Sequence, residues 1–100
     1  MSINILIIED EVDIREGISE YLSEVGYEVK VASDGQEGID LFRQNKFDLV
    51  LLDINMRGMS GVQLAKEIRK QDKDILIIFI TAEVEHALEG YNVSALNYLL

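Results

Sequence analysis

The chain has 100 residues, 48% of them hydrophobic, so it is long enough for one compact domain and too short for two. Nineteen acidic against nine basic residues give a formal net charge of −10, which disfavours direct binding to nucleic acid or to an anionic membrane. Because the sequence contains no cysteine, disulfides, thiolate chemistry and cysteine-bound zinc are excluded.

The apolar runs are too short to span a membrane. The longest of them, residues 75–80, falls far below the roughly 20 apolar residues that a spanning helix needs. Residues 1–4 carry no basic segment of the kind that opens an export signal. We therefore expect a soluble, cytoplasmic protein with no membrane contact.

The first part of the chain is predicted to form a strand, a helix and a second strand. Residues 5–8 are an uninterrupted apolar run, which is typical of a parallel strand buried on both faces. Residues 27–31 alternate apolar and polar side chains, which indicates a strand near a sheet edge. Between these strands, Gly26 stands where a left-handed C-cap ends a helix. The apolar face expected for that helix consists of Ile14, Ile18, Leu22 and Val25.

The middle of the chain continues the alternation. Residues 33–35 form a turn into a shorter helix around residues 39–42, and residues 49–52 form a second buried apolar run. Ser60 and Gln63 have the spacing of a capping box, which predicts that another helix begins there.

The last part of the chain completes the predicted domain. Residues 75–80 form a third buried run, residues 83–91 a weak helix and residues 95–100 a fifth strand candidate. Strands that alternate with helices through short connections predict a single doubly wound α/β domain with a parallel five-stranded sheet. In such sheets, ligands bind beyond the carboxyl ends of the strands, where the strand order reverses.

Acidic residues follow two of the predicted strands. Glu9 and Asp10 follow the first strand, and Asp53 follows the third. In a flavodoxin-like sheet with the order 2-1-3-4-5, these two strands are neighbours. Three carboxylates in one pocket repel one another unless a cation joins them, and Mg²⁺ prefers such oxygen ligands. The sequence therefore predicts a magnesium site that keeps positions free for a phosphoryl group.

A further set of residues matches the pattern of a known family. These residues are the acidic pair Glu9-Asp10, the segment 53–56, Gly61 eight residues past the aspartate, Thr81-Ala82 and Tyr98. Through them the chain resembles, over its whole length, the receiver domain of bacterial two-component response regulators. This resemblance implies that Asp53 takes a phosphoryl group from a phosphohistidine of a sensor histidine kinase and forms an acyl phosphate.

The same resemblance assigns the metal ligands. It implies that Asp10 and Asp53 bind Mg²⁺, that Glu9 binds it through water, and that the backbone carbonyl of Asn55 supplies a further ligand. A carboxylate can serve as the nucleophile, because phosphoryl transfer depends mainly on positioning and charge neutralisation.

The resemblance also implies a conformational switch. Thr81 is expected to contact the phosphoryl group and to move toward it, which gives Tyr98 room to turn inward. Ala82 is small enough to leave access to the phosphoryl group. Asn55 and Glu83 stand at positions that modulate acyl-phosphate hydrolysis in the family, so we expect a short-lived phosphoryl state.

Two departures from the family pattern are visible. A lysine and then a proline usually follow the last strand of a receiver, whereas this sequence stops at Leu100. The resemblance therefore implies a C-terminally incomplete receiver over residues 1–100, without its last helix, which exposes an apolar patch and self-associates. The second departure is Arg57, which replaces a common proline and is expected to leave its loop more mobile.

Residues 91–100 look most like those of receivers joined to LytTR-type DNA-binding domains. DNA binding is then expected only through an output domain that this chain lacks. The resemblance implies a signalling domain that promotes only its own phosphorylation and dephosphorylation, so it is not an enzyme in the usual sense.

Other interpretations fit parts of the pattern. Taken singly, residues 9–11 could be a solvated turn and Asp53 a helix N-cap. A pseudo-receiver would keep the fold purely for protein contacts. A phosphatase of the haloacid dehalogenase type also uses an aspartyl nucleophile, but there the nucleophile ends the first strand. A flavin-binding protein would need a Ser/Thr/Gly-rich loop after the first strand to hold the phosphate.

Overall fold

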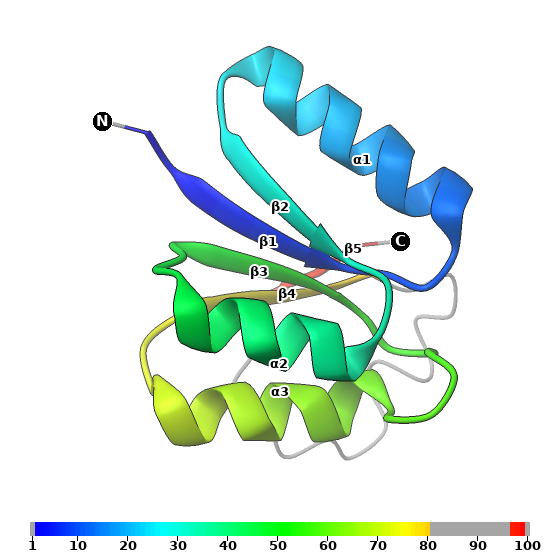
Figure 1. Ribbon diagram of the computed structural model, residues 1–100, viewed down its shortest axis with the longest axis vertical. Coiled ribbons are helices and arrows are strands. Elements are labelled where there is room, and N and C mark those ends of the chain that lie inside the picture. Colours follow the sequence, from blue (N-terminus) through cyan, green and yellow to red (C-terminus); the bar gives the residue numbers. More distant parts are fainter. Residues whose placement is uncertain (1, 81–96, 100) are drawn as a thin grey trace.

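A parallel sheet with helices on both faces forms the framework of the structure (Figure 1). The computed structural model describes residues 2–80 and 97–99. The elements in chain order are β1 (Asn4–Ile8), α1 (Val12–Val25), β2 (Glu28–Ala32), α2 (Gly35–Gln44), β3 (Leu49–Asp53), α3 (Gly61–Gln71), β4 (Leu76–Ile80) and β5 (Asn97–Leu99).

Every neighbouring pair of strands in the sheet is parallel, and the strand order is β2-β1-β3-β4-β5. The predicted flavodoxin-like sheet is therefore confirmed, including the position of β2 at one edge. Because β1 lies between β2 and β3, the chain reverses its direction of travel across the sheet after β2. This reversal places the carboxyl ends of β1 and β3 side by side.

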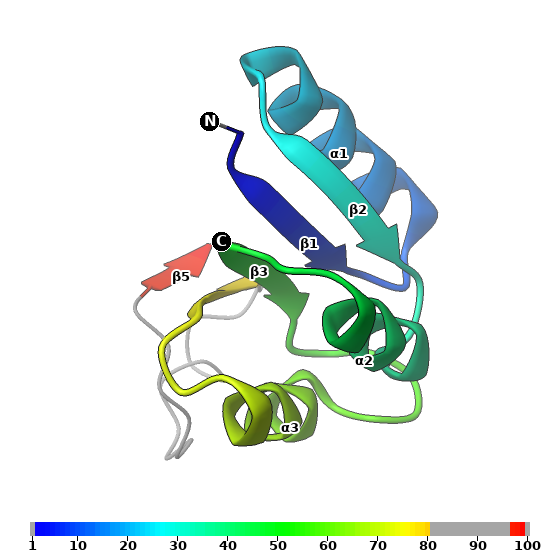
Figure 2. The same ribbon diagram turned by 60° about the vertical axis from the view of Figure 1, so that its left-hand side comes forward.

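The two faces of the sheet carry separate apolar clusters, as expected from the alternation of side chains along a strand. Ile5 and Ile7 of β1 belong to the cluster against α1, whereas Leu6 and Ile8 belong to the larger cluster against α2 and α3. Figures 1 and 2 show the same division, with α1 on one side of the sheet and the other two helices on the opposite side. Burial on both faces explains why these strands are continuous apolar runs.

Gly26 and Ser60 cap helices as predicted, and Asp34, in the predicted turn over residues 33–35, caps a third helix. Gly26 ends α1 with a φ of 116°, in the left-handed region that glycine tolerates best. Asp34 caps α2 by accepting a hydrogen bond from the main-chain N–H of Glu37 at 2.8 Å. Ser60 and Gln63 form the predicted capping box at the start of α3. These local signals therefore fix where each helix begins or ends.

The predicted apolar face of α1 is only partly buried. Ile18 and Leu22 pack against the sheet, but Ile14 and Val25 are 41% and 55% exposed, so the prediction that all four form a core face was wrong for these two. The reason is that α1 contacts the sheet through its middle, while the apolar pattern extends over its whole length.

An apolar groove of about 440 Å³ lies on the α1 face of the sheet. Ile5, Leu22, Leu51 and Ile78 are among the residues that line it.

Two predicted elements fall wholly or partly outside the described residues. The helix predicted over residues 83–91 lies entirely outside them. Of the strand predicted over residues 95–100, the structure describes residues 97–99, which form β5. Among the helices of residues 2–80, none is long and apolar enough to cross a membrane.

Candidate functional site

Three carboxylates meet at the carboxyl edge of the sheet. Ile8 at the end of β1 pairs with Leu52 of β3, so the residues that follow both positions emerge at the same edge. Ligand oxygens of Glu9, Asp10 and Asp53 all lie within 4.8 Å of one another. The predicted convergence of these three side chains is therefore observed, and we call them the acidic cluster.

Two carboxylates of the acidic cluster accept hydrogen bonds from main-chain N–H groups two residues further along the chain. Glu9 is only 2% exposed, and its Oε1 accepts a hydrogen bond from the N–H of Glu11 at 3.1 Å. Asp53 Oδ1 accepts one from the N–H of Asn55, also at 3.1 Å. These bonds hold the carboxylate of Glu9, in the β1–α1 loop, and that of Asp53, at the end of β3, at the edge of the sheet.

The electrostatics of the cluster favour protonation in the structure as it stands. Burial, together with the negative charges of Asp53 and Asp10, raises the pKa of Glu9 from 4.5 to about 7, although the hydrogen bond from the Glu11 N–H acts in the opposite direction. Burial also raises the pKa of Asp53, and repulsion by Asp10 acts in the same direction. A hydrogen bond between Glu9 and Asp53 favours a proton on Glu9, because the protonated Glu9 can donate to the Asp53 carboxylate.

These residues fit a divalent cation. The donor set is three carboxylates, the hard oxygen ligands that Mg²⁺ prefers, and their mutual spacing allows one ion to contact more than one of them. The pKa values of Glu9 and Asp53 are raised because negative charges are buried close together. A bound divalent cation would offset these charges.

Two arginines contact residues of the cluster, and the sequence interpretation gave neither contact. The main-chain N–H of Arg57 donates to Asp10 Oδ2 at 3.2 Å, and the Nε atom of Arg57 lies 3.7 Å from the same oxygen. Arg15 Nη1 donates to the main-chain carbonyl of Glu9 at 2.9 Å. The Arg57 contact joins positions 47 residues apart, so no local sequence signal predicts it, whereas Arg15 lies in the first turns of the helix that follows Glu9.

The remaining predicted site residues are placed only in part. Asn55 lies in the β3–α3 loop, two residues past Asp53, and its described contact is the N–H bond to that residue. Thr81, Ala82 and Glu83 lie outside the described residues. The main chain of Tyr98 is in β5, opposite Phe79 of β4, and its predicted side-chain switch falls outside the description.

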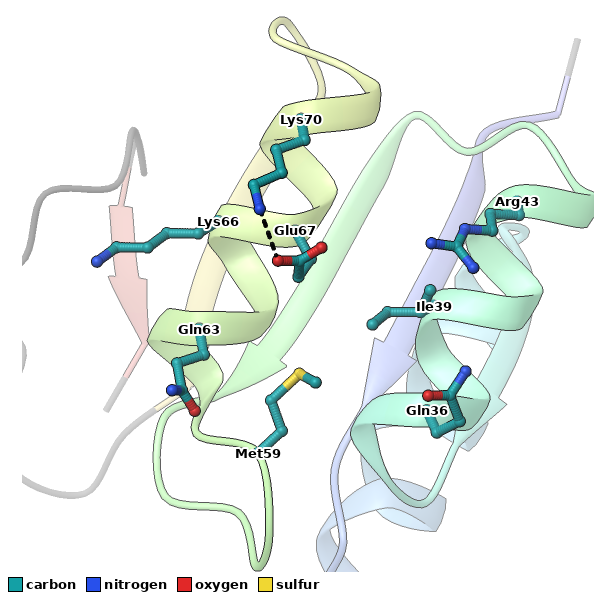
Figure 3. Close-up of a pocket in the computed structure, with 8 residues that line it drawn as sticks. All are labelled: Gln36, Ile39, Arg43, Met59, Gln63, Lys66, Glu67 and Lys70. Atoms are coloured by element: carbon teal, nitrogen blue, oxygen red, sulfur yellow. Dashed lines mark hydrogen bonds and ion pairs between the residues drawn. The ribbon is translucent and has the colours of Figure 1, made fainter.

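A hollow of about 670 Å³ lies elsewhere, between α2 and α3 (Figure 3). Ile39 and Met59 line it, together with Lys70 and Glu67, which form an ion pair at 3.0 Å. None of the acidic cluster lines this hollow. The site is therefore identified by its converging carboxylates and not by the volume of a cavity.

Comparison with known protein families identifies the chain. Residues 5–100 match the family described as the response regulator receiver domain. The chain belongs to this family. It is a phosphoacceptor signalling domain of the two-component type, and its acidic cluster occupies the carboxyl edge at which ligands bind in this fold.

The relatives include regulatory proteins longer than this chain. A probable transcriptional regulator of Guillardia theta, ycf27, is 41% identical over 98 residues, which cover 96% of this chain and 38% of that protein. The positive alginate biosynthesis regulatory protein of Pseudomonas aeruginosa is 40% identical and is covered over 40% of its length. The chain thus spans less than half the length of these relatives.

Solved structures of a response regulator and of a chemotaxis protein share this fold. The response regulator TrrA of Thermotoga maritima, solved in complex with Mg²⁺-BeF, has a TM-score of 0.92 and 41% identity, covering 100% of this chain and 86% of that one. The chemotaxis protein CheY4 of Vibrio cholerae also has a TM-score of 0.92, with 31% identity and coverage of 100% and 87%.

Proposed function

We propose that Asp53 of this receiver accepts a phosphoryl group from a phosphohistidine on a sensor histidine kinase and that the modified domain then controls an output. The observation that carries the proposal is the acidic cluster, in which Asp53 lies within 4.8 Å of two further carboxylates at the carboxyl edge of the sheet. Asp53 ends β3, whereas the nucleophile of the phosphatase alternative ends the first strand.

Mg²⁺ is the proposed cofactor. Asp10 and Asp53 would bind it directly, Glu9 through water, and Asn55 through its backbone carbonyl. When bound, the ion supplies positive charge that offsets the negative charge of the carboxylates and of the phosphoryl oxygens. The similarity to a receiver solved with Mg²⁺-BeF supports this assignment.

The transfer step uses the Asp53 carboxylate as nucleophile. A carboxylate oxygen of Asp53 attacks phosphorus, the new O–P bond forms an acyl phosphate, and the P–N bond to the donor imidazole breaks with its electron pair kept on nitrogen. The hydrogen bond from the Asn55 N–H to Asp53 Oδ1 orients the carboxylate for this attack. A proton on Asp53 would oppose the attack, so the raised pKa of this residue must be lowered before transfer is efficient.

The proposed docking surface for the kinase lies next to the acidic cluster. Val12 and Ile14, in the first turn of α1, are 47% and 41% exposed although both are apolar. Apolar side chains that remain exposed beside a reactive group suit a partner that must bring its own reactive side chain to that group.

The output is proposed to depend on Thr81 and Tyr98 as the switch, with Asn55, Ala82 and Glu83 setting the lifetime of the acyl phosphate. Residues 1–100 would act as one receiver domain, and any contact with DNA would belong to a separate output domain. Relatives named as regulators or regulatory proteins are more than twice as long as the region that matches this chain, which supports such a division.

The test is phosphorylation by a small donor. The chain is incubated with Mg²⁺ and acetyl phosphate, and intact mass spectrometry is expected to find the mass of one added phosphoryl group. Asp53→Asn is expected to remove this product, while Asp48→Asn, at a carboxylate outside the cluster, keeps it. A chain continued past Leu100 is tested in parallel, because the family's lysine would follow this residue.

The same experiment distinguishes a phosphoacceptor from a pseudo-receiver. A pseudo-receiver would bind its partners with unchanged mass under these conditions. Phosphorylation of the Asp53→Asn variant to the level of the unmodified chain would contradict the assignment of Asp53.

A further inference from the structure

Asp10 is shared between the acidic cluster and an arginine from another loop. Asp10 lies in the β1–α1 loop and Arg57 in the β3–α3 loop, and both loops leave the same edge of the sheet (Figure 1). Two groups of Arg57 approach a single atom, Asp10 Oδ2: the main-chain N–H at 3.2 Å and the side-chain Nε at 3.7 Å. Arg57 thus supplies a cation to a cluster of three carboxylates.

The side chain of Arg57 can leave this position easily. It is 95% exposed, and Nε lies beyond hydrogen-bond distance of Oδ2, so the attraction is an exposed ion pair of small strength. Asp10 itself is much less exposed, at 21%, and its Oδ2 also accepts the hydrogen bond from the main-chain N–H of Arg57, which does not depend on the position of the guanidinium. Arg57 can therefore be displaced while Asp10 keeps its place.

A divalent ion at Asp10 and the Arg57 guanidinium require the same region of space. Both are attracted by the same carboxylate, and two cations a few ångströms apart repel each other. The contact of Arg15 is different, because its guanidinium bonds the main-chain carbonyl of Glu9 and not a carboxylate of the cluster.

We propose that Arg57 is an internal cation for Asp10 that lowers the affinity of the acidic cluster for Mg²⁺, since it must leave Asp10 Oδ2 when the ion binds. This inference rests on the proposed function, which places the ion at Asp10. It makes Arg57 a residue that sets the magnesium concentration at which this receiver becomes competent for phosphorylation.

Metal binding by variants tests the inference. Free Mn²⁺ is measured by electron paramagnetic resonance at low ionic strength, and Mg²⁺ is added as competitor. Arg57→Gln is expected to lower the dissociation constants of both ions roughly two- to five-fold, which corresponds to the loss of an exposed ion pair. Arg57→Lys keeps the charge, so its dissociation constants for both ions are expected to lie closer to those of the unmodified chain.

Arg43→Gln is the matched control. It removes the same charge from α2, where Arg43 lines the hollow of Figure 3 and lies outside the acidic cluster. Its metal affinity is expected to equal that of the unmodified chain. Equal affinities for Arg57→Gln and Arg43→Gln, or weaker binding by Arg57→Gln, would overturn the inference.

Thermal unfolding distinguishes competition from a structural role. Without Mg²⁺, the Tm of Arg57→Gln is expected to be lower than that of the unmodified chain. At saturating Mg²⁺ the two Tm values are expected to be equal, since the ion replaces the lost cation. An equal loss of Tm under both conditions would mean that Arg57 only stabilises the loop, and would overturn the inference. Failure of the unmodified chain to bind either ion would instead overturn the proposed function, and this inference with it.

Discussion

Gly61, the first residue of α3, packs so closely against Asp53 that a side-chain carbon on Gly61 would collide with the main-chain oxygen of Asp53. The same carbon would lie 2.7 Å from the Cα atom of Ile54, closer than carbon atoms approach in real structures. The Gly61 N–H also donates to the carbonyl of Ile54 at 3.0 Å. The start of α3 therefore helps to fix the backbone that carries Asp53.

Gly61→Ala is expected to destabilise the domain and to displace Asp53. The obstacle is main chain, which cannot rotate away as a side chain can, so we expect a loss of about 1–3 kcal/mol in the free energy of unfolding. Metal binding is expected to weaken in the same variant. Urea unfolding and Mn²⁺ binding measure the two effects.

Gly17→Ala is the matched control for this substitution. Gly17 lies inside α1, and no atom lies within 4 Å of the position that its Cβ would occupy. Alanine there is expected to stabilise the domain by roughly 0.5–1 kcal/mol, because glycine is a poor residue inside a helix. If both variants had the same stability, close packing at Gly61 would not be the reason for glycine at that position.

The buried carboxyl of Glu9 predicts how stability depends on pH. A raised pKa in the folded state, about 7 against 4.5, means that Glu9 favours folding at pH values below 4.5 and that this contribution is lost as the pH rises through 7. The raised pKa of Asp53 acts in the same direction. For Glu9 alone, the loss corresponds to at most about 3 kcal/mol.

Unfolding of Glu9→Gln checks this prediction. In the presence of a chelator, the unmodified chain is expected to lose more stability between pH 5 and pH 8 than Glu9→Gln loses. Mg²⁺ is expected to raise the Tm of the unmodified chain strongly at pH 8 and weakly at pH 5, where protons compete for the same oxygens. Glu24→Gln, on the exposed side of α1, should follow the unmodified profile; parallel profiles for all three proteins would contradict the prediction.

The positions of the three carboxylates could be predicted because they depend on topology. Continuous apolar runs identified β1 and β3 as buried strands, and a doubly wound sheet brings their carboxyl ends together whatever the details of side-chain packing. With the strand order 2-1-3-4-5, Glu9, Asp10 and Asp53 are expected to meet at one edge of the sheet, as observed. The cap residues Gly26 and Ser60 were equally predictable, since their signals are local.

Tertiary contacts limited the rest of the prediction. Periodicity gives the apolar face of α1, but only the packed structure determines that Ile14 and Val25 remain exposed. Arg57 was interpreted from the sequence only as the loss of a proline. Its contact with Asp10 depends on how two loops from different strands approach each other, which no pattern within either loop encodes.

Ser60 provides a test of the local signals. Its side chain accepts a hydrogen bond from the N–H of Gln63, and the Gln63 side chain accepts one from the N–H of Ser60, at 3.2 and 3.3 Å. Ser60→Ala removes the first of these bonds and is expected to cost about 1 kcal/mol in urea unfolding. Ser23→Ala in α1 is the control and should change stability by much less. A Ser60→Ala variant as stable as this control would mean that the capping box is unimportant for α3.

The apolar groove on the α1 face predicts self-association of the chain of residues 1–100. Ile3, which lines the groove, is 45% exposed, so lysine at this position can reach water without disturbing the core. Sedimentation velocity is expected to detect concentration-dependent association of the unmodified chain and a weaker association of Ile3→Lys. Tyr21→Lys is the control. The substitution adds the same charge, and Tyr21 is 66% exposed and does not line the groove. Equal effects of the two substitutions would attribute the association to net charge instead of to the groove, and a monomer at all concentrations would contradict the prediction entirely.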